Sequence, residues 1–368
     1  MTSEEEIKEL NLKLMTECKN QDLGKIKELI ANGAQANYVK RIQGTWGAYK
    51  RESVLHAAMQ SLKKENEKTD VKTWKEIILL LLKSGSDPNE KYEDYDWRGC
   101  GTSQSVFDLM GSKMDSDLFT AIIKAGLDPN LVSVTDRHSM RTDGCAKSNL
   151  LHNFSRSGNV DFVVVLLEAG ADVDVYATEN VSNERGYREN RSETALHLAA
   201  SNDHLQVCIF LLAKGADINK MHTFIDSNLN EEIENSNRTD DPRDENYKNP
   251  WENVPVECTA LHLALKESLY DLAKFLLAAG ANHQIPYKRG DKKISCFDLF
   301  STGVNSTIEK EEALKNALSG KMSLESLIKS MTPGVGAKVL SSLAKVQDLG
   351  WEMDNYNFGN IFKSLKPL

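Results

Sequence analysis

Apolar residues recur along the chain with the period of an α-helix. In one stretch, Leu205, Cys208, Ile209 and Leu212 share a helical face, and the pattern ends before Gly215. Glycine commonly ends a helix because it adopts the left-handed conformation without steric cost. A shorter helical stretch precedes this one and opens with the hexapeptide TALHLA at 194–199. These signals together predict a unit of helix, turn, helix and glycine stop.

The hexapeptide TALHLA occurs again at 259–264, and the same kind of unit follows it up to Gly280. Related openings elsewhere in the chain read SVLHAAM, SVFDLM, NLLHNF and SCFDLF. Repetition on this scale predicts a stack of similar units, each of which buries its apolar face only against its neighbours. The predicted copies lie near 7–37, 53–89, 105–130, 148–174, 193–219, 258–282 and 295–319.

These repeated segments resemble the ankyrin repeat, whose consensus T-P-L-H-x-A opens a pair of antiparallel helices that is followed by a hairpin finger. The resemblance implies an all-α fold, an ankyrin-repeat solenoid of stacked helix-turn-helix units with long hairpin fingers, over residues 1–320. Two departures are visible. The consensus proline is missing from every one of these openings, and Asp108 and Asp298 stand where histidine is expected.

The polar residues of the repeat opening have roles of their own. Thr194 and Thr259 are placed to cap the first helix of a unit by accepting hydrogen bonds from its free N–H groups. A histidine follows three positions after each cap. The resemblance implies that its imidazole braces neighbouring backbone and is not a metal ligand. These histidines are His56, His152, His197 and His262.

The fingers are longer than those of a plain array. From each terminating glycine to the next helix cap the distance ranges from 15 residues (Gly280 to Ser295) to 44 (Gly215 to Thr259), where a repeat of about 33 residues leaves about 12. Insertions in a solenoid map to loops on one face, often the binding face. Of the fifteen Trp and Tyr residues, eleven lie in these segments, so the fingers are the predicted contact surface.

Aromatic residues and arginine dominate the energy of many protein interfaces, and both gather in the fingers. The predicted partner-binding residues are Trp46, Tyr49, Tyr95, Trp97, Arg98, Arg137, Arg141, Tyr187, Arg188 and Trp251. A structural alternative stays open, since enlarged loops need small cores and Trp or Tyr can supply them by packing one finger on the next.

The longest finger, 220–257, has ten acidic and four basic residues. It is too polar to fold unaided, but Phe224, Tyr247 and Trp251 offer apolar side chains for docking. We expect it to be partly ordered along the concave side of the array. The alternatives are a disordered acidic linker and an anionic patch for a basic partner.

Residues 321–368 follow the repeats as a C-terminal helical cap or tail. Leu324, Leu327, Ile328 and Met331 share one helical face, and a second amphipathic stretch begins after Pro333. The segment is too short for an independent core, so we expect it to pack on the last repeat. The alternative is an adaptor box that recruits other machinery, such as a ubiquitin ligase, although no good match to such a box is present.

The net charge and the composition limit the classes of partner and the cellular locations that we expect. The formal net charge of −9 repels phosphate backbones, so nucleic acid is not an expected partner. The amino terminus has no apolar signal sequence, and no apolar run reaches membrane-spanning length. The six cysteines are scattered without a C-x-x-C pair, which fits a reducing compartment. We therefore expect a cytoplasmic or nuclear monomer without membrane insertion.

One group of reactive residue types stands close together in the sequence: Asp136, His138, Asp143, Cys145 and His152. Nucleophilic catalysis needs a Cys–His pair within hydrogen-bond reach and a third group that orients the His. A zinc site needs four convergent ligands. The spacing compels neither arrangement, and no phosphate-binding loop or G-x-S-x-G elbow is present. We therefore expect no enzyme activity, no catalytic residues, no metal and no cofactor.

The sequence thus predicts a non-enzymatic interaction module or scaffold that binds a protein partner through its fingers and concave face. The main alternative is an adaptor whose tail recruits other machinery. A third possibility follows from the resemblance alone, since asparagines in the D-x-N turn of ankyrin repeats can be hydroxylated. Asn89, Asn130 and Asn219 match that position.

Overall fold

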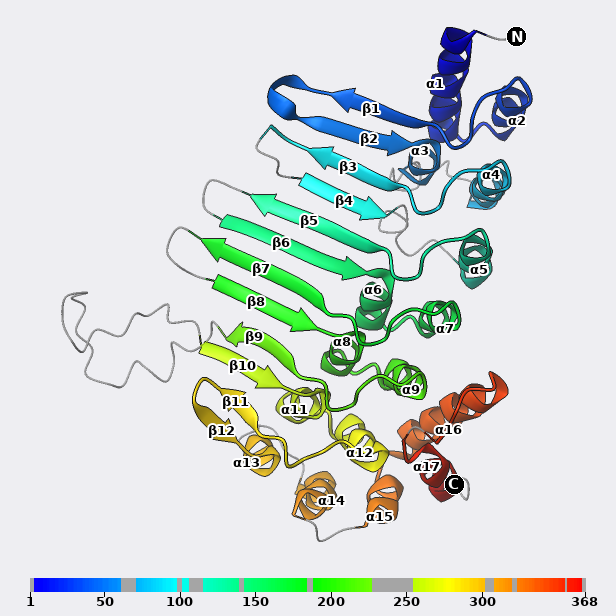
Figure 1. Ribbon diagram of the computed structural model, residues 1–368. Helices are drawn as coiled ribbons and strands as arrows, with labels where there is room; N and C mark the ends of the chain where they lie inside the picture. Colours follow the sequence, from blue (N-terminus) through cyan, green and yellow to red (C-terminus); the bar gives the residue numbers. More distant parts are fainter. Residues whose placement is uncertain are drawn as a thin grey trace, which may run out of the picture. The chain divides into compact units, whose positions relative to one another are not determined.

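The computed structural model describes residues 3–60, 71–97, 101–105, 115–138, 142–183, 188–226, 254–301, 308–319, 323–354 and 356–365 (Figure 1). The chain divides into two compact units. Unit 1 comprises Met1–Met140, Cys145–Leu150 and Glu168–Ala171, and unit 2 comprises Arg141–Gly144, Leu151–Leu167 and Asp172–Leu368.

Five α-helices are described in unit 1. They are α1 (Glu4–Asn20), α2 (Leu23–Ala31), α3 (Val54–Gln60), α4 (Val71–Lys83) and α5 (Ser116–Lys124). Of these, α1/α2 and α3/α4 form pairs, and α5 follows them. Helix α1 packs on α2 and α3, and α4 packs on α2, α3 and α5. The core between them is closed by Trp74, which is fully buried and donates from its indole Nε1 to the carbonyl of Ala58 at 3.1 Å.

The fingers of unit 1 are β-strands. They are β1 (Val39–Gln43), β2 (Tyr49–Ser53), β3 (Lys91–Tyr95), β4 (Gly101–Ser105) and β5 (Val132–His138). Each pairs with the next in antiparallel fashion, so that one finger hairpin is hydrogen-bonded to the following one. Strand β6 (Thr142–Asn149) contains residues of both units.

Unit 2 continues the same plan. Its repeat helices are α6 (Leu150–Ser157), α7 (Val160–Glu168), α8 (Ala195–Ser201), α9 (Leu205–Ala213), α11 (Ala260–Lys266), α12 (Tyr270–Ala279), α13 (Cys296–Ser301) and α14 (Ile308–Leu318). Its strands are β7 (Ala177–Asn183), β8 (Arg188–Glu193), β9 (His222–Asp226), β10 (Val254–Cys258), β11 (Tyr287–Arg289) and β12 (Lys292–Ile294). Strands β7 to β12 pair antiparallel in chain order.

The expectation of an all-α fold was wrong. The described residues contain twelve antiparallel strands, and all of them lie in the finger segments. The cause is finger length, because a long extended hairpin carries many backbone N–H and C=O groups that need partners. A neighbouring hairpin supplies those partners. The fingers are therefore sheet, and the helix pairs carry the hydrophobic core.

The predicted polar brace at the start of a repeat is present in unit 2. Thr259 and His262 form a capping box at the start of α11. The backbone N–H of Thr259 donates to Nδ1 of His262 at 2.9 Å, which leaves the proton of the neutral ring on Nε2. That Nε2 donates to the carbonyl of Ile285 at 2.9 Å, just before β11. Each brace thus ties a helix start to the base of a finger.

The tail forms three helices, α15 (Leu324–Lys329), α16 (Pro333–Asp348) and α17 (Phe358–Leu365). We expected it to pack on the last repeat, and α15 does contact α14. However, α16 packs on α9, and α17 packs on α12 and α15 (Figure 1). The Trp351 ring meets Phe210 edge-on at 6.0 Å, and Phe358 stacks on Phe275 at 6.2 Å. The tail therefore covers second helices of two earlier repeats.

Candidate functional site

The tip of the first finger presents a strained and exposed tryptophan. The turn between β1 and β2 is a short 3₁₀ segment, Thr45–Gly47, in which Trp46 has φ 63° and ψ 23°. This left-handed region is unfavourable for a bulky residue, and glycine or asparagine is usual there. The Trp46 side chain is nevertheless 87% exposed. Packing within the fold does not explain a strained Trp in solvent, so a contact outside the fold is the better explanation.

More exposed aromatic surface lies beside this tip. Tyr49 opens β2 and stands directly opposite Tyr95 at the end of β3. Their rings stack with centroids 5.1 Å apart and planes 21° from parallel. Tyr49 is 41% exposed, and Trp97, two residues beyond Tyr95, is 61% exposed. We call Trp46, Tyr49, Tyr95 and Trp97 the finger-tip cluster.

Large exposed apolar residues are concentrated on these two fingers. Seven described residues of this kind are exposed, and four of them, Ile42, Trp46, Tyr49 and Trp97, lie on the first two fingers. Scattered single apolar residues on a surface need no explanation, but several on neighbouring fingers, with charged side chains beside them, are typical of an interaction site. The first two fingers are therefore the best candidate surface in unit 1.

Charged side chains hold the strands beneath the finger-tip cluster. Lys50 on β2 pairs with Asp94 on β3 at 3.1 Å, and the hydroxyl of Tyr92 donates to the same carboxylate at 2.8 Å. Arg51 pairs with Glu90 at 2.7 Å. These cross-strand pairs fix the register that brings Tyr49 against Tyr95.

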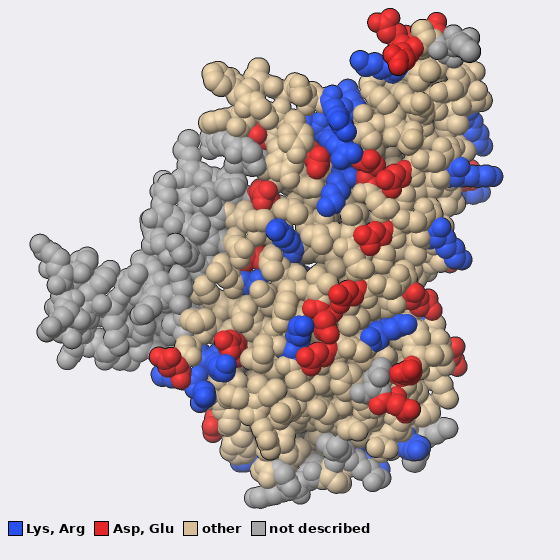
Figure 2. All heavy atoms as spheres, viewed as in Figure 1, with Lys and Arg blue, Asp and Glu red and all other residues tan. Residues whose placement is uncertain are grey.

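A shallow groove and a basic stripe run along the same strands. Residues of β1 and β2 together with Glu93 line a cavity of about 280 Å³. Figure 2 shows Lys and Arg side chains gathered over β1 to β3. Burial raises the pKa of the Tyr49 and Tyr95 hydroxyls, and the negative charge of Glu93 adds to this effect. Both phenols are therefore neutral hydrogen-bond donors at the edge of a cationic surface.

Of the ten predicted partner-binding residues, the structure describes the side chains of four, those of the finger-tip cluster, and it brings Tyr49 and Tyr95 into contact. Arg137 and Arg188 lie on β5 and β8, but their side chains are outside the described part of the molecule. The remaining four, Arg98, Arg141, Tyr187 and Trp251, fall outside the described residues altogether. Sequence reasoning missed Ile42, although an isolated isoleucine in the polar segment VKRIQ was a usable signal.

The base of the longest finger is a regular hairpin. Strand β9 pairs with β10, placing Phe224 opposite Val256. The ring of Phe224 lies 4.9 Å from that of His222, and the ammonium of Lys266 lies 5.6 Å from its centroid. Residues 227–253, including Tyr247 and Trp251, are outside the described part, so docking along the concave side stays a prediction.

Among the reactive residue types of 136–152, His152 and Cys145 have surroundings that suit a structural role and not a catalytic one. His152 is buried on α6, and its Nε2 donates to the carbonyl of Val175 at 2.9 Å, as expected of a brace. Burial lowers the pKa of His152, which keeps it neutral. In unit 1, burial and then the carboxylate of Asp136 raise the pKa of the Cys145 thiol, opposite to what a nucleophile needs. The side chains of His138 and Asp143 are outside the described part.

The described residues contain no arrangement typical of a metal site or a membrane-spanning helix. No group of three or more His, Cys, Asp or Glu side chains there is arranged to hold a metal ion. Burial raises the pKa of Cys18 and of Cys258 to about 12, so neither thiol is poised for metal binding or oxidation. None of the described helices combines the length and apolarity needed to cross a membrane.

The asparagines of the D-x-N turns join successive repeats. In unit 1, the Asn89 amide donates to the carbonyl of Gly126 at 2.8 Å and accepts from the N–H of Asp128 at 2.7 Å. In unit 2, Asn219 accepts from the N–H of Asn282 at 2.8 Å. These side chains have a structural role in the turn ladder. Their hydroxylation stays a prediction.

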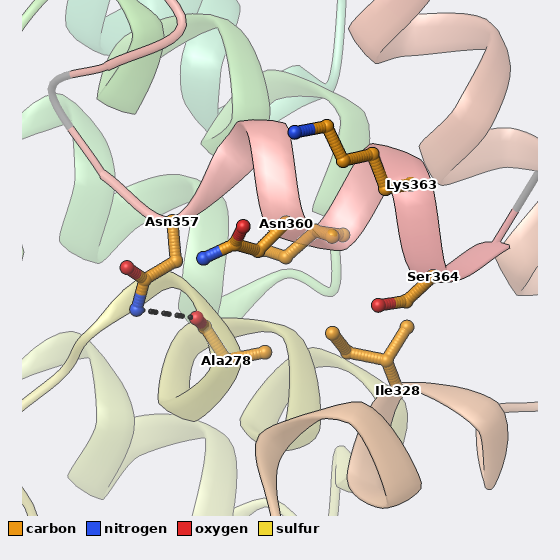
Figure 3. Close-up of a pocket in the computed structure, with 7 residues that line it drawn as sticks. Ala278, Ile328, Asn357, Asn360, Lys363 and Ser364 are labelled. Carbon is orange, nitrogen blue, oxygen red and sulfur yellow. Dashed lines mark hydrogen bonds between the residues drawn. The ribbon is translucent and has the colours of Figure 1, made fainter.

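A second cavity, of about 460 Å³, lies where α12, α15 and α17 meet (Figure 3). Asn357 spans its edge and donates from its side-chain amide to the carbonyl of Ala278 at 3.1 Å. Asn360 and Lys363, which also line it, are exposed on α17. The cavity is therefore a polar seam between the tail and the array, and it has no buried charged group that would bind a specific ligand.

Two family models for ankyrin repeats match the chain. One, for three copies of the repeat, matches residues 112–222, and the other, for a single repeat, matches residues 257–288. These two ranges of the chain are ankyrin repeats. The matched ranges include the helix pairs α6/α7, α8/α9 and α11/α12.

Among solved structures, the ankyrin repeat domain of human ASB11 is similar to this chain. The two are 15% identical, the TM-score is 0.43, and the match covers 84% of this chain and 97% of the other. Proteins of the ankyrin repeat family are generally protein–protein interaction modules and are typically not enzymes.

Proposed function

We propose that this ankyrin repeat protein is a non-enzymatic binding module that holds a protein partner at its first two fingers and the adjoining concave face. The observation that carries the proposal is Trp46, a bulky residue in the left-handed region whose side chain is 87% exposed. Such a side chain lowers both stability and solubility unless it has a partner. Three further members of the finger-tip cluster extend the same surface.

The test compares exposed with buried tryptophans. Trp46→Ala and Trp97→Ala in the full chain should each weaken binding of the partner captured by the wild-type protein by at least tenfold, because aromatic anchors dominate interface energy. Their melting temperatures should stay within a few degrees of the wild type. The matched control is Trp74→Ala, which removes a fully buried side chain and should cost about 3–5 kcal/mol of folding free energy.

If Trp46→Ala and Trp97→Ala keep full partner binding, the finger-tip cluster is not the binding surface. If instead Trp46→Ala unfolds the protein as Trp74→Ala does, the residue acts in packing. Partner capture from a lysate followed by titration of the purified pair gives both the identity and the affinity that these comparisons need.

The adaptor alternative depends on a free tail, and the packing of α16 and α17 favours a cap instead. Val339, Leu343, Phe358 and Ile361 of these helices are fully buried. Their exposed faces are polar, for instance at Lys338 and Lys363. Reversing both charges by substitution to Glu should leave the set of captured partners unchanged, whereas an adaptor surface on these faces should lose one class of partner. A cytoplasmic or nuclear location and a monomeric state stay predictions from the sequence.

A further inference from the structure

Strand β1 is the terminal strand in the strand order, and its outer edge is open among the described residues. β1 pairs with β2, and no other described strand pairs with it. An open edge presents unpaired N–H and C=O groups, which form a template for another extended chain.

The register shows which backbone groups face outward. Val54 N–H donates to the carbonyl of Tyr38 at 3.1 Å, and Gly44 N–H donates to that of Ala48 at 2.7 Å. Hydrogen-bonded pairs alternate along an antiparallel ladder, so the even-numbered positions of β1 bond to β2. The N–H and C=O groups of Val39, Arg41 and Gln43 therefore point to the open edge.

The side chains along this edge are basic. Lys40 and Arg41 make no ion pair with any described residue, whereas Lys50 and Arg51 on β2 have acidic partners. Arg41 stands directly opposite Arg51 across the β1–β2 ladder, but Arg51 is already paired with Glu90 and Glu93, so Arg41 is the member of this pair without a carboxylate among the described residues. An incoming carboxylate beside Arg41 or Lys40 would supply the ion pair that each of these side chains lacks among the described residues.

The same charges argue against a second copy of this chain as the occupant. Arg41 is the central residue of β1, so two β1 edges paired about a twofold axis would place Arg41 against Arg41. Basic residues on an edge strand are a known means of preventing such self-pairing. The charge pattern selects an acidic strand over an identical one.

We propose that the β1 edge binds an extended acidic segment of a protein partner by strand addition, an inference that rests on the proposed function and specifies the partner's chemistry. Backbone groups of Val39, Arg41 and Gln43 pair with the added strand. Acidic side chains of that strand meet Lys40 and Arg41. An apolar residue at the end nearest the hairpin turn contacts Trp46, which follows β1 by three residues.

The probes are capped, fluorescently labelled seven-residue peptides added to the full-length protein. Because Lys40 and Arg41 lie on opposite faces of β1, the first peptide carries Glu at the positions beside both of them, Val elsewhere and Trp at its end. A second replaces every Glu by Lys, and a third carries N-methyl groups on the amides that would face β1. The acidic peptide should bind at least tenfold more tightly than either of the others. Hydrogen exchange at the amides of Val39, Arg41 and Gln43 should slow at least tenfold on binding.

The matched variants are Gln43→Pro and Ile42→Pro. Gln43→Pro removes an outward N–H and leaves the β1–β2 ladder intact, since proline is tolerated on the open side of an edge strand. It should weaken peptide binding at least tenfold without a change in melting temperature. Ile42→Pro removes an inward N–H and should destabilise the hairpin itself.

Several results would overturn the inference. Equal binding of the N-methylated peptide, or binding without amide protection, would mean docking through side chains alone. Absence of binding, equal binding of the Lys peptide, or light scattering that shows a dimer of this chain would each exclude an acidic strand on β1. The proposed function fails separately, when Trp46→Ala and Trp97→Ala leave partner capture unchanged.

Discussion

Asp174 occupies the turn position that Asn89, Asn130 and Asn219 hold in other repeats. The Asn89 side chain both accepts a backbone N–H and donates to a carbonyl of the next repeat. The carboxylate of Asp174 accepts from the N–H of Asp217 at 3.1 and 3.2 Å through its two oxygens, but when ionised it has no proton to donate. Substitution of Asp174 by Asn should therefore complete the turn ladder and stabilise the protein.

The size of the effect follows from the groups involved. The new amide N–H can donate to the Gly215 carbonyl as Asn89 does to Gly126, and a net intramolecular hydrogen bond contributes about 0.5–1.5 kcal/mol. Burial, and then the charges of Asp217 and Asp172, raise the pKa of Asp174, although Lys220 and the Asp217 N–H act the other way. The ionised form is thus disfavoured on balance. We expect Asp174→Asn to raise the free energy of unfolding by about 1 kcal/mol at pH 7.

Urea denaturation of the full-length protein at several pH values measures this difference. The pKa of Asp174 is higher in the folded than in the unfolded protein, so the folded wild type gains relative stability as the pH falls through the folded pKa. The advantage of the Asn variant should shrink accordingly below pH 7. Asn89→Asp is the matched reverse change and should destabilise by a similar amount. A neutral or destabilising effect of Asp174→Asn would refute the ladder argument.

Two further predictions concern buried ionisable groups. Burial lowers the pKa of His197 to about 3 and that of His262 to about 4, from 6.5. The stability that these neutral histidines confer is therefore lost as the pH falls from about 6.5 to 4, by on the order of 2 kcal/mol per histidine at pH 5. A His262→Leu variant should show a shallower pH dependence of the unfolding free energy. The fully buried Lys274 pairs with Asp271 at 3.4 Å and donates to the carbonyl of Ser330 at 2.9 Å. Lys274→Met leaves Asp271 without this partner and should destabilise the tail by about 3 kcal/mol and accelerate hydrogen exchange in α15 and α16. Lys345→Met, which removes the exposed ion pair with Asp161, should cost less than about 1 kcal/mol.

The helical half of the fold could be read from the sequence because its signals are local. The TALHLA openings, the capping threonines and the terminating glycines all act within one turn of a helix, and Gly215 and Gly280 do adopt positive φ. The strands had no comparable signal. Segments such as YKRES in β2 and ATENVSN in β7 lack apolar alternation, and they become strands because a neighbouring hairpin pairs with them.

The residue types of the candidate site could be predicted from the sequence, but their positions relative to one another could not. An excess of Trp and Tyr in the fingers indicated a contact surface. The stacking of Tyr49 on Tyr95, however, depends on a register between strands that are far apart in the sequence. The left-handed backbone of Trp46 is set by its turn and has no sequence signal, since Trp is rare in that conformation. Docking of α16 on α9 is likewise a long-range contact that local patterns do not encode.

The pairing of each finger with the next has a consequence for how such a chain can change in length. Every finger contributes two strands, and neighbours within a unit run antiparallel. Loss or duplication of a whole repeat would thus rejoin the ladder with the same alternation of direction. Removal of a single strand would leave two neighbours parallel and their hydrogen bonds mismatched. The number of repeats in such a chain can therefore change only by whole repeats. A chain that has lost one strand of a finger would lose the hydrogen-bonded pairing of its neighbours.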